Sequence, residues 1–329
     1  EEFADLKIKW LFDSKVDPNP HKEWLSREYT KWSKCFADYD DQINGIIVNE
    51  ITLVFNTTSR ERLLCLTKCL DVLVYCNKLC KGTGREGGVS VMEEVVTKLL
   101  STLESGRCDQ EFSLGQRLLG ALSAIEPDIN GHQKSYLRSS LKNSFRAQLH
   151  IQRKYSSDDK IIPFDDYYTI RSAESGWGYM IALSEYNIEY SIPESVRYNE
   201  YVLRFYDTSV RLCLATEDYL TLKSRLATNN IRNGVISYAY SNGCSIQSAL
   251  DYYYKYIKEL QNESNSLFKT IQHNLELNTK GLNEYMVCVM KMPVAYQQVI
   301  SDIYKFEVKD NFICSPVWDQ LNQTLLKSH

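Results

Sequence analysis

Apolar residues recur along most of this chain at steps of three and four, the spacing of one face of an α-helix. The first such run extends from His21 to about Ile43, behind Pro18 and Pro20. A second run, from Ser59 to Cys80, is apolar on most of its circumference, which is typical of a helix surrounded by other helices. The pattern therefore predicts a helical protein with one long helix in its interior.

Further helical runs follow to the end of the chain. The helix that begins after Pro163 is interrupted by Gly176 and Gly178, which predicts a break there. Neither an internal repeat nor a linker separates the runs, so the expected architecture is all-α, a single antiparallel helical bundle over residues 1–329. The remaining predicted helices are 90–103, 114–125, 130–155, one after Pro193, 210–226, 233–240, 245–275 and 281–306.

Composition supports this fold class and removes some functions. The 329 residues include 14 glycines and 7 prolines, fewer than sheet-rich domains usually need for their turns. The net charge is −4 with mixed signs, so the chain offers no basic field that could hold a nucleic-acid backbone. We therefore expect no nucleic-acid partner.

Cysteine usage and hydropathy bear on the compartment. The ten cysteines lie in a chain well above the size that needs disulfides, and we expect reduced thiols in a cytoplasmic protein. The best apolar run, residues 63–79, contains Lys68, Asp71 and Lys78, so no membrane span is expected. The chain begins with Glu1 and no methionine, which leaves room for an upstream targeting segment.

The residues with the clearest chemistry lie between 168 and 252. Glu217, Thr221 and Arg225 are spaced by four and would share one helical face. Arg171 lies 46 positions before Glu217, and Asn233 lies 16 positions after it. A guanidinium such as that of Arg171 can hold diphosphate oxygens bidentately and stays charged, although a surface arginine paired with a neighbouring acid has the same sequence appearance.

These three points, together with the Gly-Cys-Ser-Ile-Gln-Ser-Ala-Leu-Asp run at 243–251, resemble the C-terminal half of class I terpene synthases. In that family two metal-binding motifs face each other across a helical barrel, and an arginine between them senses the substrate diphosphate. The resemblance makes Arg171 the sensor, Glu174 the linker and Ser175 the effector at the helix break. It implies Mg²⁺ as cofactor, held by Glu217 and Thr221, with Asp218 as a further acidic ligand.

The chain also departs from the family pattern. Residues 75–81, where an aspartate-rich motif is expected, contain no carboxylate, and Asp71, two turns before Lys78, is the nearest candidate metal ligand. Arg225 stands where the family has a glutamate, and a guanidinium cannot bind Mg²⁺. We expect cationic side chains to take over part of the metal's work, as in noncanonical fungal cyclases such as certain humulene synthases. The candidate diphosphate ligands are Arg171, Arg225, Lys223, Lys78 and Lys81, with Tyr304 and Lys305 near the C-terminus.

The resemblance implies a cyclase that ionises a linear prenyl diphosphate, with farnesyl diphosphate and a sesquiterpene product expected for a chain of this size. Aromatic residues, 12% of the chain, could line the apolar pocket that carbocations require. A homodimer is left open. The alternative is an inactive relative that binds an isoprenoid or a protein partner, and the degenerate motifs favour it. A chain-elongating prenyltransferase would need two aspartate-rich motifs, which are not visible.

Overall fold

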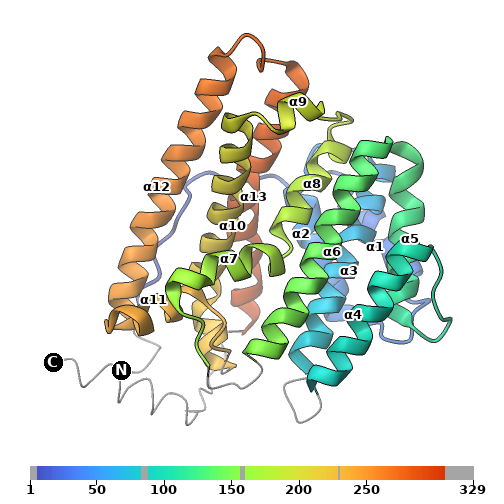
Figure 1. Ribbon diagram of the computed structural model, residues 1–329, viewed down its shortest axis with the longest axis horizontal. Coiled ribbons are helices and arrows are strands. Elements are labelled where there is room, and N and C mark those ends of the chain that lie inside the picture. The colour runs from blue at the N-terminus through green and yellow to red at the C-terminus, as the bar shows by residue number, and fades with distance from the viewer. Residues whose placement is uncertain (1–5, 83–87, 156–159, 229, 308–329) are drawn as a thin grey trace.

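The computed structural model describes residues 6–82, 88–155, 160–228 and 230–307, except for the side chains of 80–82, 88 and 304–307. Within these ranges the chain is helical and contains no strand, as the hydrophobic pattern predicts (Figure 1). The helices are α1 (Lys22–Ser33), α2 (Asp41–Val54), α3 (Arg60–Gly82), α4 (Gly88–Ser105), α5 (Ser113–Ile125), a 3₁₀ turn η2 (Glu126–Asp128), α6 (Gly131–Lys154), α7 (Phe164–Glu174), α8 (Trp177–Asn187), α9 (Glu194–Arg197), α10 (Glu200–Ala227), α11 (Gly234–Asn242), α12 (Ile246–His273) and α13 (Lys280–Glu307).

Five of these helices form a closed ring. In order around the ring, α2 packs on α3, α3 on α8, α8 on α10, α10 on α13, and α13 on α2 again. Helices α1 and α5 cover α3 from outside, α6 covers α8, and α11 and α12 cover α10 (Figure 1). The ring therefore places the inner faces of α2 and α10 across from one another, with α13 between them on one side.

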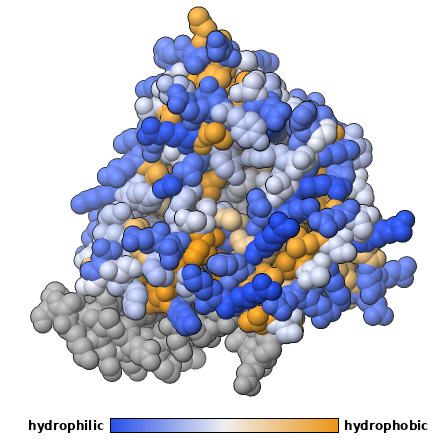
Figure 2. Space-filling model, in the orientation of Figure 1, coloured by the Kyte–Doolittle hydropathy of each residue, from blue (hydrophilic) through white to orange (hydrophobic). Residues whose placement is uncertain are grey.

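Amphipathic helices account for this arrangement. Apolar side chains such as Leu66, Phe145 and Met292 are fully buried between the helices. Hydrophilic side chains cover most of the face shown in Figure 2, with apolar side chains gathered in patches between them. None of the helices in the described ranges carries an apolar stretch long enough to cross a membrane.

The first predicted helix is wrong in extent. Residues 21–43 were expected to form one helix, but α1 ends at Ser33 and the chain turns before α2 begins. The carboxylate of Asp40 accepts hydrogen bonds from the backbone N–H groups of Gln42 and Ile43 and so caps a new helix. Apolar spacing continued through the turn because Phe36 packs edge-on against Trp32 there, at 4.9 Å between ring centroids. Most of α2 was not predicted at all.

The break between α7 and α8 is confirmed. Gly176 has a φ of 81°, a left-handed conformation that glycine adopts without strain. A Cβ at this position would lie 2.9 Å from Cδ1 of Leu73, so the backbone here also lies close to α3. α7 ends at Glu174 and α8 begins at Trp177, and both helices contact α10.

Candidate functional site

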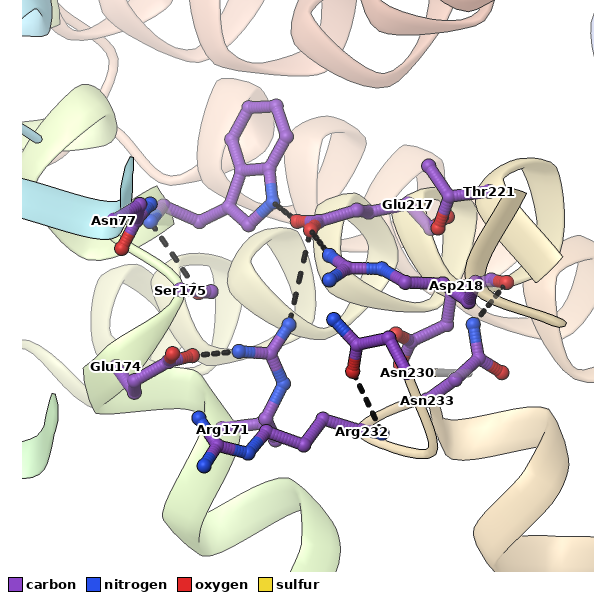
Figure 3. A network of polar contacts seen from close by, with 12 residues as sticks. Asn77, Arg171, Glu174, Ser175, Glu217, Asp218, Thr221, Asn230, Arg232 and Asn233 are labelled. Carbon is purple, nitrogen blue, oxygen red and sulfur yellow. Dashed lines mark hydrogen bonds and ion pairs between the residues drawn. The ribbon is translucent and has the colours of Figure 1, made fainter. Parts of the chain in front are cut away.

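Arg171 is the centre of a polar cluster between α7 and α10. Its side chain is 5% exposed and forms an ion pair with Glu174 one turn later on α7. Its Nη2 lies 3.7 Å from Oε1 of Glu217, and its Nε donates a hydrogen bond of 3.2 Å to the hydroxyl of Tyr167. Figure 3 shows the guanidinium between the two carboxylates. The surface-arginine interpretation therefore fails on burial, although the pairing with Glu174 is real.

Glu217 connects three helices at this cluster. Its Oε2 accepts a hydrogen bond of 2.9 Å from the indole Nε1 of Trp177 at the start of α8. Its Oε1 lies 3.3 Å from Nη2 of Arg225, in addition to its contact with Arg171. One carboxylate thus holds two guanidinium groups, and an anion entering the cluster would meet both of them.

The face of α10 predicted from the spacing of four is present. The hydroxyl of Thr221 donates to the backbone oxygen of Glu217 at 2.7 Å, which leaves its lone pairs free to accept. Arg225, one turn further on, points back to Glu217 and is 16% exposed. Glu217, Thr221 and Arg225 therefore line one side of the cluster in the expected order.

Asp218 has a different surrounding from its neighbour Glu217. It lies about 100° further round α10, is buried, and accepts a hydrogen bond of 2.9 Å from Tyr167. Burial raises the pKa of its carboxyl to about 7, although Arg171 opposes the shift. Asp218 thus supports Arg171 through Tyr167, while its Oδ2 accepts no hydrogen bond from the described residues, and its role as a metal ligand stays a prediction.

Asn233 ties α11 to the same stretch of α10. Its Nδ2 donates to the backbone oxygen of Asp218 at 2.7 Å, and its Oδ1 accepts from the backbone N–H of Val235 at 2.9 Å. The side chain is fully buried and caps α11. Asn233, 16 positions after Glu217, therefore links the start of α11 to α10 beside Glu217.

Asp71 was predicted as a candidate metal ligand, and its position argues against that role. It is fully buried, and both of its carboxylate oxygens contact Nη1 of Arg117, at 2.8 and 3.0 Å. Tyr29 of α1 also donates to it. Asp71 and Lys78 share a face of α3, as predicted. The described partners of Asp71 on this face belong to α1 and α5, and none belongs to α10. Because Asp71 is fully buried and is paired with residues of α1 and α5, away from Arg171 and Glu217, we withdraw it as a ligand.

The remaining predicted cations are placed unequally. Lys78 is partly exposed and held 2.9 Å from Asp40 at the start of α2. Lys223 lies about 200° round α10 from Thr221, on the opposite side of the helix from the cluster. The side chains of Lys81, Tyr304 and Lys305 lie outside the described part of the chain.

Three polar contributors were not predicted from the sequence. Trp177 joins Glu217 to α8, and the Gly-Trp-Gly break was the available signal for it. Asn77 of α3 accepts a hydrogen bond of 2.8 Å from Gln148 of α6. Figure 3 shows Asn77 at the edge of the polar network. Arg232, directly before Asn233, donates to the side chain of Gln152 at 3.2 Å and adds a cation to the loop before α11.

A divalent metal ion finds few protein ligands at this cluster. Among the described residues, no three acidic, histidine or cysteine side chains converge on one point. Glu217 and Thr221 supply one carboxylate and one hydroxyl within one helical turn. Mg²⁺ commonly uses one or two carboxylates and takes its other oxygens from phosphates and water. The donor set therefore fits one such ion that binds together with a diphosphate.

Comparisons with known proteins identify the family of this chain. The family model described as terpene synthase family 2, C-terminal metal binding, matches residues 81–263. No protein of curated function matches the sequence significantly.

Solved structures match over nearly the whole fold. Germacradien-4-ol synthase from Streptomyces citricolor has 11% identity and a TM-score of 0.75, with 91% of this chain and 99% of that one covered. Linalool/nerolidol synthase from Streptomyces clavuligerus, in complex with 2-fluorogeranyl diphosphate, has 9% identity and a TM-score of 0.74 over 86% and 99%. Hedycaryol synthase has 14% identity and a TM-score of 0.75 over 91% and 99%. At these identities the likeness shows the fold, whereas the family model covers more than half of the chain. The chain therefore belongs to the terpene synthase family and has the all-α fold of the class I enzymes.

Proposed function

We propose that this protein is a class I terpene cyclase that ionises farnesyl diphosphate and cyclises the resulting cation to a sesquiterpene. The observation that carries the proposal is the buried guanidinium of Arg171, fixed by Glu174 at the helix break and turned toward Glu217 and Arg225 on α10. A cationic cluster fixed in advance stabilises the charge that develops on a departing diphosphate without further rearrangement.

In this mechanism Arg171 and Arg225 bind oxygens of the diphosphate group. The bond between C1 of the substrate and the diphosphate oxygen breaks, and its electron pair leaves with the diphosphate. Glu174 keeps Arg171 in place while the leaving group gains charge. Trp177 and Tyr296, whose rings meet edge to face at 5.3 Å between centroids, offer aromatic surface near the cluster. Such faces stabilise carbocations, and exclusion of water prevents their early capture.

A divalent metal ion would be held by Glu217 and Thr221 together with diphosphate oxygens, and when bound it would neutralise part of the leaving-group charge. Arg225 takes the place of a third ligand and contributes a positive charge there directly. We expect the protein to depend on Mg²⁺ less steeply than a cyclase with two complete acidic motifs. The likeness to fungal humulene synthases, the cytoplasmic location and assembly as a homodimer remain predictions.

The second candidate function is an inactive relative that binds an isoprenoid or a protein partner. It is favoured by the absence of any carboxylate from residues 75–81 and by the pairing of Asp71 with Arg117, which removes Asp71 as a ligand. Against it, Arg171 and Arg225 bring two guanidinium groups to Glu217, and this pair of cations supports the binding of a diphosphate there.

Incubation of the purified protein with farnesyl diphosphate and Mg²⁺, with and without EDTA, separates these functions. An organic overlay analysed by gas chromatography and mass spectrometry reports a cyclic product. Product that disappears with EDTA supports a metal-assisted cyclase, and product that survives EDTA points to Arg171 and Arg225 as sufficient. Absence of product with farnesyl, geranyl and geranylgeranyl diphosphates would overturn the cyclase in favour of the binding protein.

A further inference from the structure

Tyr167 occupies a buried position one turn before Arg171 on α7. Its side chain is 3% exposed and packs against Tyr155 and Ile162. Gly234 at the start of α11 faces the same ring, and a Cβ at that position would lie 2.9 Å from Cε1 of Tyr167. Because the ring is enclosed so closely, the point at which its phenolic hydroxyl lies is fixed by packing.

The hydroxyl of Tyr167 has two polar partners, and both belong to the candidate site. It accepts a hydrogen bond of 3.2 Å from Nε of Arg171 and donates one of 2.9 Å to Oδ1 of Asp218. A hydroxyl group has one proton to donate and two lone pairs to accept with, so both bonds form together. The phenolic oxygen therefore lies between the guanidinium on α7 and a carboxyl group on α10.

The bond to Tyr167 gives the guanidinium of Arg171 a second fixed nitrogen. Nη1 pairs with Glu174, one turn later on α7, and Nε is held by Tyr167, one turn earlier. The guanidinium is planar. A planar group held at one nitrogen can still rotate about that contact, whereas contacts at two nitrogens fix its plane. The third nitrogen, Nη2, then faces α10, where Oε1 of Glu217 lies 3.7 Å away.

The same hydroxyl also helps to set how α7 lies against α10. Glu217 and Asp218 are consecutive residues of α10. The first contacts Arg171, and the second contacts Tyr167 one turn earlier on α7. Two contacts side by side resist a shift of one helix along the other better than one contact does. Loss of the hydroxyl would remove one of them and release Nε of Arg171, while the packing of the ring would stay.

We infer that Tyr167 is a positioning residue, which holds Arg171 in the orientation that departure of the diphosphate requires, a role that rests on the function proposed above. Tyr167 acts through the guanidinium, because its hydroxyl is occupied by Arg171 and Asp218. Charged groups that stabilise a leaving group are most effective when their geometry is fixed beforehand, and a displacement of about 1 Å can slow a reaction about 10²-fold. The expected effect is therefore on the rate of ionisation.

Y167F tests this role because phenylalanine keeps the enclosed ring and removes only the hydroxyl. The matched control is Y168F, since the hydroxyl of Tyr168 also donates to an aspartate, Asp207, at 3.1 Å. Asp207 lies ten residues before Glu217, or about 15 Å along α10. We expect Y167F to lower kcat for diphosphate release by about 10- to 100-fold, with KM for farnesyl diphosphate within about threefold of the wild type. Y168F should keep both values close to those of the wild type.

A double-mutant cycle separates positioning from a general loss of structure, because residues that act as one unit are not additive. If Tyr167 acts through Arg171, Y167F should slow diphosphate release by less than about twofold once R171M has removed the guanidinium. A hydroxyl that supported only the fold would slow R171M by the same factor as the wild type. Y168F/R171M is the control for the double variant.

A second measurement does not depend on turnover. In a ¹H–¹⁵N spectrum of the arginine side chains, the Nε–H signal of Arg171 is identified by its absence from R171M. We expect this signal to shift in Y167F, and its proton to exchange faster with water, because the acceptor at 3.2 Å is gone. The signal should keep its position in Y168F. An unchanged Nε–H signal in Y167F would contradict the bond on which the role depends.

The outcomes separate the two proposals. A wild-type protein that releases no diphosphate overturns the proposed function and, with it, the role of Tyr167 in departure, whereas the Nε–H signal still reports whether Tyr167 holds Arg171. A wild-type protein that turns over while Y167F matches Y168F overturns only the role of Tyr167. Equal slowing of the wild type and of R171M by Y167F assigns the hydroxyl to the fold and also overturns that role.

Discussion

Replacement of Arg171 by methionine removes the guanidinium while keeping a long side chain. Loss of one partner from a buried ion pair usually costs about 3–5 kcal/mol, mostly because the other charge remains buried and unpaired. Glu217 would keep Arg225 at 3.3 Å, so the carboxylate left without compensation is that of Glu174, which is 11% exposed. We therefore expect R171M to lower the free energy of unfolding by about 3 kcal/mol, the lower end of that range.

The same substitution removes a donor for the leaving diphosphate. Loss of one such donor typically slows the chemical step by about 10²- to 10³-fold. The assay is urea unfolding followed by fluorescence, together with diphosphate release from farnesyl diphosphate. The double variant R171M/E174Q is the control, because it also removes the uncompensated charge. It should recover most of the stability and none of the activity.

Two results would refute this reasoning. If R171M and the wild type unfold at the same urea concentration, the ion pair with Glu174 does not carry the stability assigned to it. If R171M is less stable but releases diphosphate at the wild-type rate, Arg171 is a structural residue and the sensor role is lost.

Three further substitutions test the surroundings of the cluster. In G234A the added Cβ would meet the hydroxyl of Tyr253 and lie 2.8 Å from Oδ2 of Asp218, so overpacking should cost about 1–3 kcal/mol in urea unfolding; an unchanged midpoint would disprove the close packing. In the wild type the pKa of Asp218 is raised to about 7, so the folded state binds a proton that the unfolded state has released. Stability should therefore fall as the pH rises from about 4 to about 7, by at most about 1.4 kcal/mol per pH unit, and D218N should lack this contribution; equal pH profiles would contradict it. D71N should lower the free energy of unfolding by about 3 kcal/mol because it weakens the pairing of buried Arg117. The Mg²⁺ concentration for half-maximal activity should not change, and a shift in that concentration would return Asp71 to the metal site.

The parts of the site that follow from helical periodicity could be predicted. Glu217, Thr221 and Arg225 share a face because a spacing of four determines it, whatever the helix packs against. The break at Ser175 and Gly176 was predictable because glycine there has a conformation that other residues rarely adopt. The order of the helices also follows the hydrophobic pattern closely.

The direction in which a face points could not be predicted. Asp71 and Lys78 share a face of α3 as expected, but α1 and α5 cover Asp71 there, and the pairing with Arg117 depends on residues 46 positions away. The same limit applies to Asp218, whose role depends on Tyr167 from another helix. Neighbours distant in sequence decide such cases.

The extent of α2 shows a further limit of sequence reasoning. This helix was largely missed because apolar spacing ran through the turn before it.

The central claim is that this chain converts a prenyl diphosphate to a cyclic terpene. The most direct test measures released diphosphate and terpene product together, from farnesyl diphosphate, with the wild-type protein and R171M side by side. The account predicts a cyclic hydrocarbon or alcohol in near-equal amount to the released diphosphate, with both lost in R171M. Tight binding of farnesyl diphosphate without release of diphosphate would contradict it and identify an isoprenoid-binding protein.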